Sequence, residues 1–261
     1  MVQRKTLTFV HPSVWDDPKE LGLLYEYISF LLFDIFNSKP NMSKMSKLSS
    51  YYTTLFITYC QSWTKLEESD ALWRIYSHNN CAIRIGIKSK VVNALDDVFI
   101  QPVLYTEHPF IFLKQPHNAN TLISTKRKAF SHEKEVRLIH YAEHLLDEGI
   151  TQRLDVLDEL FPRFSSISFK NKKPNDAESR DFFHFSRVTI FENIFQNIQP
   201  VIHIDFSHIQ NFIYSVMLHP LAPDWFEETV RDYCKLNDIK FLGKSKLYQR
   251  DEPWSSNPFS I

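Results

Sequence analysis

The chain has few glycines, few cysteines and no long apolar run, and each shortage excludes a class of protein. Its four glycines are far apart in the 261 residues. A dinucleotide-binding glycine fingerprint and a Walker-type phosphate loop are therefore both absent. The three cysteines are scattered, without Cys-x-x-Cys or zinc-ligand spacing, which predicts no disulfide framework and favours a reducing, cytoplasmic compartment.

Membrane association is also disfavoured by the sequence. The longest apolar stretch, at 27–36, is interrupted by Ser29 and Asp34 and is too short to span a bilayer. The first residues lead at once into a strand-like run, so we expect no signal peptide. The net charge of -1 gives no global electrostatic reason for binding a membrane or a nucleic acid. It does not exclude a local basic groove.

Apolar periodicity predicts one α+β domain over 1–261, with a mixed or antiparallel split sheet and flanking helices. The expected strands lie at 7–10, 51–63, 81–87, 98–105, 201–206, 212–218 and 239–242. The expected helices lie at 18–36, 69–76, 88–95 and 223–235. A phenylalanine-rich insertion is expected at about 144–200. Its cluster Phe182–Phe195 either closes the core or, if exposed, forms a surface for an antitoxin or another protein partner.

The segment 126–137, Lys-Arg-Lys-Ala-Phe-Ser-His-Glu-Lys-Glu-Val-Arg, concentrates charge before an apolar run. Alternation predicts Glu133 and Glu135 on the same face of a strand entrance, with Lys126 and Arg127 a short way upstream. Carboxylates set against fixed cations favour a site for a polar, phosphate-bearing ligand. The alternative is an edge strand with ordinary ion pairs, in which Glu135 pairs with Arg137 or Arg74.

Two other segments carry candidate site residues. In the short helix at 69–76, Trp73 and Tyr76 are three residues apart and share a face, either as a ring platform for a base or as core packing. The acidic pair at 16–17 with His11 could mimic a metal site, but its place before Pro18 makes helix capping, with Glu20 reaching back, the preferred interpretation. The other histidines lack His-Glu-x-x-His spacing, so we predict no metal.

Four pieces of the sequence together resemble an uncharacterised bacterial family, a domain of unknown function. The first is Phe-Val-His-Pro-Ser-Val-Trp-Asp-Asp-Pro-Lys-Glu at 9–20. The second joins Ser-Trp at 62–63 to Glu-Ser-Asp-Ala-Leu-Trp-Arg-Ile-Tyr at 68–76 and the strand at 82–85. The third is the charged segment 126–137, and the fourth runs through 213–220, 222–223 and 244–248. The four pieces span nearly the whole chain.

That family is similar, more remotely, to ADP-ribosyltransferases, including toxins that modify nucleic acids. The resemblance implies that NAD binds in a cleft between two small sheets and that Glu135 is the catalytic carboxylate, with Glu133 second. It assigns NAD binding to Ser62, Trp73, Tyr76, Arg84, Lys126 and Arg127. It implies a toxin or defence protein that transfers ADP-ribose to a nucleic acid or protein. Relatives carry a further strand before residue 9, so we expect a site that is inactive, shortened, or completed by His11 or Arg4.

The chemistry behind this assignment is electrostatic. Breaking the bond between nicotinamide and ribose develops positive charge on the ribose, and a fixed carboxylate that faces this charge stabilises the transition state. Two rival functions stay open. One is a non-catalytic nucleotide- or protein-binding module of a toxin–antitoxin or anti-phage system. The other is a nuclease that uses the paired carboxylates and Lys126 around magnesium.

Overall fold

The structure is a computed structural model that describes residues 4–15, 17, 20, 27–28, 31, 50–51, 53–107, 119–145 and 198–249. It divides into two compact units. The first unit comprises 1–65 and 96–205, and the second comprises 66–95 and 206–261. Each unit is described by itself.

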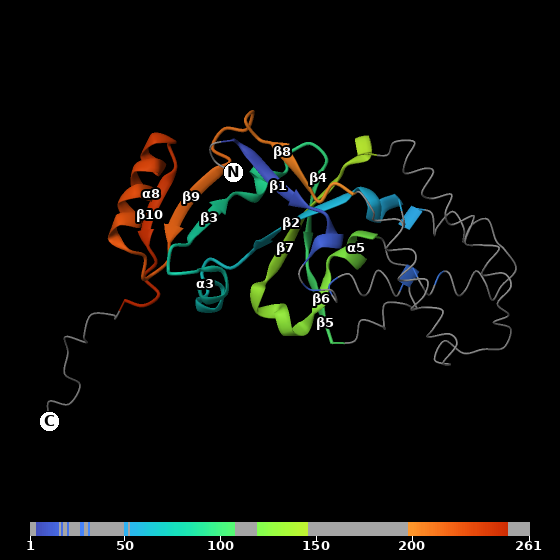
Figure 1. The fold of residues 1–261 in the computed structure, drawn as a ribbon, viewed down its shortest axis with the longest axis horizontal. Coiled ribbons are helices and arrows are strands. Elements are labelled where there is room, and N and C mark those ends of the chain that lie inside the picture. Colours follow the sequence, from blue (N-terminus) through green and yellow to red (C-terminus); the bar gives the residue numbers. More distant parts are fainter. Residues whose placement is uncertain are drawn as a thin grey trace, which may run out of the picture. The chain divides into compact units, whose positions relative to one another are not determined.

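A five-stranded sheet with the order β4-β7-β2-β1-β8 forms the centre of the first unit (Figure 1). Every neighbouring pair in it is antiparallel. The strands are β1 (Thr6–Val10), β2 (Thr58–Thr64), β4 (Val98–Pro102), β7 (Glu135–Tyr141) and β8 (Val201–Asp205). The middle strands β2 and β7 place Cys60 opposite Ile139 and Ser62 opposite Arg137. Alternation along β1 buries Leu7 and Phe9 completely.

Shorter elements surround the entrance to β7. A parallel pair is formed by β5 (Leu104–Thr106) and β6 (Thr125–Arg127). The helix α5 (Ala119–Ile123) precedes β6, and the 3-10 helix η3 (Lys128–Glu133) joins β6 to β7. Two more 3-10 turns are η1 (Pro12–Val14) and η4 (Glu143–Leu145). Because β6 and η3 directly precede β7, the charged segment 126–137 folds back on itself rather than forming one strand.

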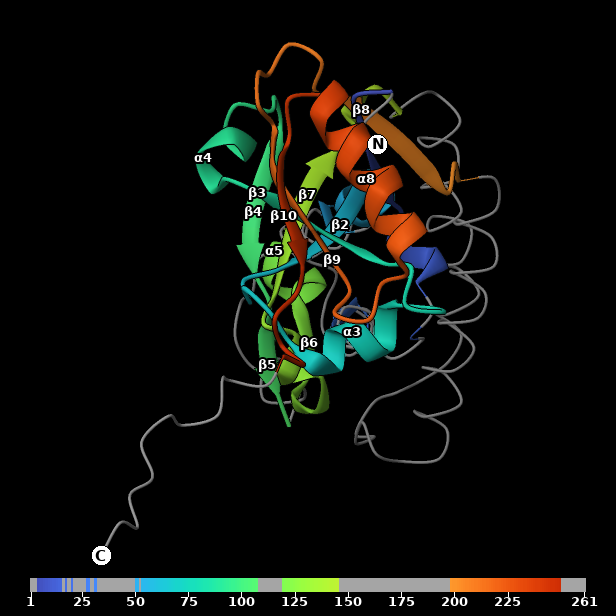
Figure 2. The same cartoon turned by 90° about the vertical axis from the view of Figure 1, so that its left-hand side faces the viewer.

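The second unit contains a three-stranded sheet with the order β10-β9-β3. Its strands are β3 (Ile83–Ile87), β9 (Ile213–Leu218) and β10 (Lys240–Lys244). β10 runs parallel to β9, whereas β3 is antiparallel to it. The crossover from β9 to β10 is α8 (Asp224–Leu236), and Figure 2 shows this helix running alongside the sheet. Two short helices complete the unit, α3 (Asp70–Tyr76), which Ser69 caps, and α4 (Ser89–Val92).

The structure confirms the α+β class and most of the predicted elements. The strands expected at 7–10, 81–87, 201–206, 212–218 and 239–242 are present, as are the helices at 69–76, 88–95 and 223–235. The stretch 98–105 holds two strands, β4 and β5, which are separated at Val103. The longer helix predicted at 18–36 lies mostly outside the described residues. Within this range, the described residues Tyr27, Ile28 and Leu31 are helical and buried.

The strand predicted over 51–63 is wrong in its first half. Tyr51 and residues 53–57 are helical, and the strand begins only at Thr58. A short apolar run such as Leu-Phe-Ile does not distinguish a buried strand from a buried helix. Thr58 and Thr54 donate their hydroxyls to the carbonyls four residues earlier, Thr58 at 2.5 Å and Thr54 at 2.8 Å. These bonds satisfy the two hydroxyls within a helical turn.

Some predictions are not decided by the described residues. The phenylalanine cluster Phe182–Phe195 lies outside them, as does nearly all of the insertion at 144–200, and the single domain over 1–261 stays a prediction. Among the helices that the structure describes, none has the length and apolar character needed to cross a membrane.

Candidate functional site

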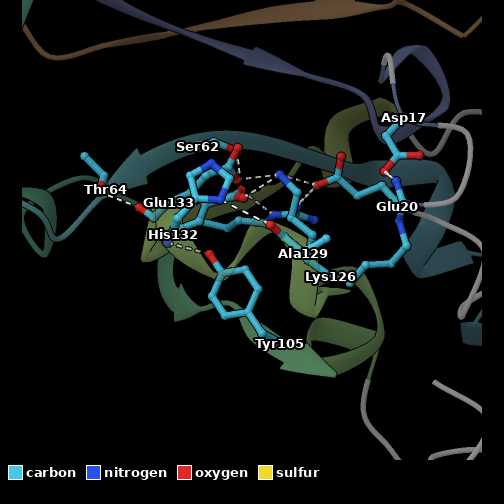
Figure 3. Close-up of polar contacts among 12 residues, drawn as sticks. Asp17, Glu20, Ser62, Thr64, Tyr105, Lys126, Ala129, His132 and Glu133 are labelled. Atoms are coloured by element: carbon cyan, nitrogen blue, oxygen red, sulfur yellow. Dashed lines mark hydrogen bonds and ion pairs between the residues drawn. The ribbon is translucent and has the colours of Figure 1, made fainter. Parts of the chain in front are cut away.

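The two carboxylates of the charged segment reach the same cation, although not through strand alternation. Glu133 ends η3, and Lys134 then adopts a left-handed conformation with φ 45°, so that only Glu135 belongs to β7. The expectation that both glutamates share one strand face is therefore wrong. Lys126 Nζ nevertheless lies 2.8 Å from Glu133 Oε2 and 3.1 Å from Glu135 Oε2. Figure 3 labels Lys126 and Glu133 among the residues of these polar contacts.

Arg137 forms the second centre of the cluster. Its side chain is 1% exposed, and its Nε donates to Glu135 Oε1 at 2.8 Å. Its two terminal nitrogens bond the backbone carbonyl of Ile123 and the carboxylate of Glu20. Its guanidinium carbon lies 4.2 Å from the centre of the Trp15 ring. Arg137 is thus fixed from four directions, as the planar fork of an arginine allows.

The segment 9–20 meets the segment 126–137 in space. Besides the Trp15 contact, Glu20 Oε1 lies 3.4 Å from Lys126 Nζ, and Asp17 Oδ2 accepts from Arg127 at 2.8 Å. The Glu20 carboxylate, predicted to reach back as a helix cap, binds Lys126 and Arg137. The residues that would begin the capped helix lie outside the described part of the chain.

Glu135 is held at the surface end of this cluster. The hydroxyl of Ser62, an exposed residue of β2, donates to Glu135 Oε1 at 2.6 Å. The backbone amide of Glu135 donates to the hydroxyl of Tyr105 on β5 at 2.8 Å. Thr64, two residues after Ser62 and also exposed, donates to the backbone carbonyl of Glu133 at 2.6 Å. The Glu135 side chain is 5% exposed, so the carboxylate is buried but hydrogen-bonded to the exposed residue Ser62.

The charges of the cluster keep Glu135, Lys126 and Arg137 ionised. Burial works to raise the pKa of Glu135, but the charge and hydrogen bond of Arg137, the Ser62 hydroxyl and the Lys126 charge together lower it below its ordinary value. Burial works to lower the pKa of Lys126, and the three carboxylates around it raise it instead. Arg137 has its pKa raised in the same way by Glu135 and Glu20. At neutral pH the site therefore holds an anchored carboxylate anion.

His11 has a structural environment. Its ring is buried, Nε2 lies 3.0 Å from the carbonyl of Leu55, and Nδ1 accepts from the backbone amide of Ser13 at 3.2 Å. Burial lowers the pKa of His11 to about 4. Asp16 lies outside the described residues. Over the described ranges, no group of three or more His, Cys, Asp or Glu side chains is arranged to hold a metal ion.

Three predicted NAD-binding residues belong to the second unit. Trp73 is buried, donates from Nε1 to Glu68 Oε1 at 2.9 Å and packs edge-to-face on His219, as the core-packing alternative predicts. Tyr76 is 65% exposed, and Arg84 is half-buried on β3. Their sharing of a cleft with Glu135 stays a prediction. Arg74 belongs to this unit and pairs with Asp70 at 2.8 Å, whereas Arg137 is the ion-pair partner of Glu135.

Sequence reasoning brought together Ser62, Lys126, Glu133 and Glu135 correctly but missed three residues of the same cluster. Glu20 is predicted from the sequence to be part of a helix cap, and neither Trp15 nor Tyr105 carries a sequence signal for this cluster. No spacing rule links position 20 to position 137. The available signal is that the segments 9–20 and 126–137 carry complementary net charges.

Comparisons with protein-family models, with curated proteins and with solved structures found no match. The arrangement can hold one carboxylate ionised and immobile beside the exposed residues Ser62 and Thr64.

Proposed function

We propose that the first unit contains an ADP-ribosyltransferase-like site in which Glu135 is the catalytic carboxylate. The observation that carries the proposal is the hydrogen bond from the exposed Ser62 to the buried, ionised Glu135. A buried carboxylate that only stabilises the fold through ion pairs does not need a hydrogen bond to an exposed residue. The carboxylate is also fixed at the first residue of a central strand, which suits a group that must keep its orientation during a reaction.

In this proposal Glu135 accepts a hydrogen bond from a ribose hydroxyl of NAD and faces the positive charge that develops on the ribose. NAD supplies the ADP-ribose group that is transferred. Ser62 orients the carboxylate, and Arg137 and Lys126 prevent its protonation. Such preorganised electrostatics contributes about 3–4 kcal/mol for one well-placed group. The acceptor is a nucleic acid or a protein, consistent with a toxin or defence protein.

Glu133 has a supporting part in the proposal. It shares Lys126 with Glu135, and its backbone carbonyl is bonded by Thr64. Removing its charge leaves Lys126 with Glu135 and Glu20 as its carboxylate partners, which favours the ionised form of Glu135 rather than opposing it. Substitution of Glu133 should therefore reduce transfer much less than substitution of Glu135.

The test is transfer of label from radioactive NAD to macromolecules of a cell extract. The wild type should transfer label, Glu135→Gln should lose it, and Glu133→Gln should keep a substantial part. Glu107→Gln is a matched control, because this carboxylate is exposed and pairs with Lys128 at 2.8 Å outside the cluster. Label transfer that is equal in Glu135→Gln and the wild type would contradict the proposal.

A non-catalytic binding module is the second candidate. It is favoured by the fact that both oxygens of the Glu135 carboxylate already have partners in the chain. This candidate predicts saturable binding of a nucleotide with no turnover, and equilibrium dialysis with labelled NAD distinguishes it from the enzyme.

A further inference from the structure

One end of the sheet in the second unit gathers lysines around an exposed aromatic ring. β3 is antiparallel to β9 and β10 is parallel to it, so the end of β3 and the starts of β9 and β10 meet. Tyr214, the second residue of β9, lies there and is 43% exposed. Lys88, just after β3, has its Nζ 4.2 Å from the centre of the Tyr214 ring, and Lys240 at the start of β10 has its Nζ 5.7 Å away.

More positive charge belongs to the same end. Lys90 lies on α4, which directly follows β3, and Lys235 lies in the last turn of α8, which leads into β10. Both residues are exposed. The nearby acidic residues are Asp238, in the connection from α8 to β10, and Asp232, one turn earlier in α8.

At the opposite end of the same unit, two of the cations have carboxylate partners. Lys244 pairs with Asp224 at 2.6 Å and with Glu227 at 3.4 Å, and Arg74 pairs with Asp70 at 2.8 Å. Within the part of the chain that the structure describes, neither Lys88 nor Lys240 has an ion pair with a carboxylate. The two ammonium groups lie over the Tyr214 ring instead.

We propose that Tyr214, with Lys88 and Lys240, is a binding site for single-stranded nucleic acid. An exposed ring can stack on a nucleobase of any identity, and ammonium groups on both neighbouring elements can contact the flanking phosphates. The cation–π contacts keep the two ammonium groups over the ring until a strand arrives, when a base takes their place on the ring and they contact the phosphates. A double strand fits less well, because its bases are not available for stacking.

The site is independent of the activity proposed for Glu135, since binding needs no turnover. If Glu135 catalyses ADP-ribose transfer, the Tyr214 site would bind a nucleic acid that accepts the group. Glu135→Gln should therefore bind a single strand as the wild type does, even though it loses transfer. This variant separates a failure of the binding site from a failure of the proposed enzyme.

The experiment is a fluorescence anisotropy titration of the full chain with a labelled single strand of about 12 nucleotides. Tyr214→Leu should weaken binding by roughly tenfold, and Tyr214→Phe should restore it, because the phenyl ring still stacks. The double substitution Lys88→Gln with Lys240→Gln should weaken binding and reduce the salt dependence. The slope of log K against log salt should fall in magnitude by about 1.4 for two lost phosphate contacts.

Matched controls come from the other end of the unit. Trp225 is 62% exposed in the first turn of α8, beside Asp224, and Lys246 is exposed after β10. Trp225→Leu and Lys246→Gln should bind as the wild type does. The proposal is overturned if the wild type shows no saturable binding, if Tyr214→Leu binds equally well, or if a duplex of the same length binds as tightly. Thermal unfolding of each variant verifies that the fold is retained.

Discussion

At the scale of single residues, Arg137 is the side chain on which the first unit depends most. It is buried, and its guanidinium contacts Glu135, Glu20, the Ile123 carbonyl and the Trp15 ring. Its desolvation is offset because each of its three guanidinium nitrogens donates a hydrogen bond, two of them to carboxylates. A lysine carries the same charge but cannot form the fork or stack in the same way.

Arg137→Lys should therefore lower the free energy of unfolding by about 3 kcal/mol, because at least one buried carboxylate loses its partner. Urea denaturation at pH 7 measures the change. Arg127→Lys is the matched control, because Arg127 forms a single, half-exposed pair with Asp17. Arg127→Lys should lower the free energy of unfolding much less than Arg137→Lys does. Equal effects of the two substitutions would show that the cluster does not stabilise the unit in this way.

His11 gives the fold a defined sensitivity to acid. Burial lowers its pKa from 6.5 to about 4, so the folded state prefers the neutral ring. Below pH 6.5 the unfolded chain binds a proton that the folded chain does not. The contribution of His11 to the free energy of unfolding is thus fully present above pH 6.5 and declines as the pH falls toward about 4.

Between pH 7 and pH 5 this residue should reduce the free energy of unfolding by about 2 kcal/mol. His11→Gln, which does not titrate, should show a correspondingly flatter pH dependence in urea denaturation. His203, exposed on β8, provides the control, and His203→Gln should keep the slope of the wild type. If His11→Gln loses as much stability on acidification as the wild type, the assigned role of His11 is wrong.

At the scale of elements, the pairing of β3 with β9 depends on a close approach. A Cβ added at Gly86 would lie 2.6 Å from the hydroxyl oxygen of Ser215, which is buried directly opposite. Gly86 therefore leaves space for the serine side chain rather than supplying backbone freedom.

Gly86→Ala should reduce the free energy of unfolding by about 1–3 kcal/mol through overpacking. The double variant Gly86→Ala with Ser215→Ala lacks the serine hydroxyl oxygen, so much of the lost free energy of unfolding should be recovered. A double-mutant cycle with denaturation curves measures the coupling, which we expect to be about 1 kcal/mol. Additive effects would mean that the strain does not arise at this contact.

Helices and strands were predictable from the sequence where a local signal determines their position. Ser69 and the apolar spacing after it fixed the position of α3, and alternation located β1 and β8. The helix before β2 was not predictable, because a Leu-Phe-Ile run suits both structures. The turn at Lys134 was also missed, since a left-handed lysine carries no sequence signature, and that turn determines how Glu133 and Glu135 meet.

At the scale of the whole molecule, the cluster is assembled by tertiary contacts. Glu20, Ser62 and the pair Lys126 and Arg137 come from three different parts of the sequence and meet because β2 pairs with β7 while β6 and η3 fold beside β7. The sequence indicated which residues carry the charge but not that Trp15 and Glu20 complete their environment. That information exists only in the pairing of distant segments, which no local rule supplies.

The central claim is that Glu135 acts as a catalytic carboxylate rather than as one member of a structural ion-pair network. The most direct measurement is the rate at which purified protein releases nicotinamide from NAD, compared between the wild type and Glu135→Gln. The account predicts measurable release by the wild type and a loss of at least about 100-fold in the variant, with its thermal unfolding retained. No release by the wild type, or equal release by both proteins, would contradict it.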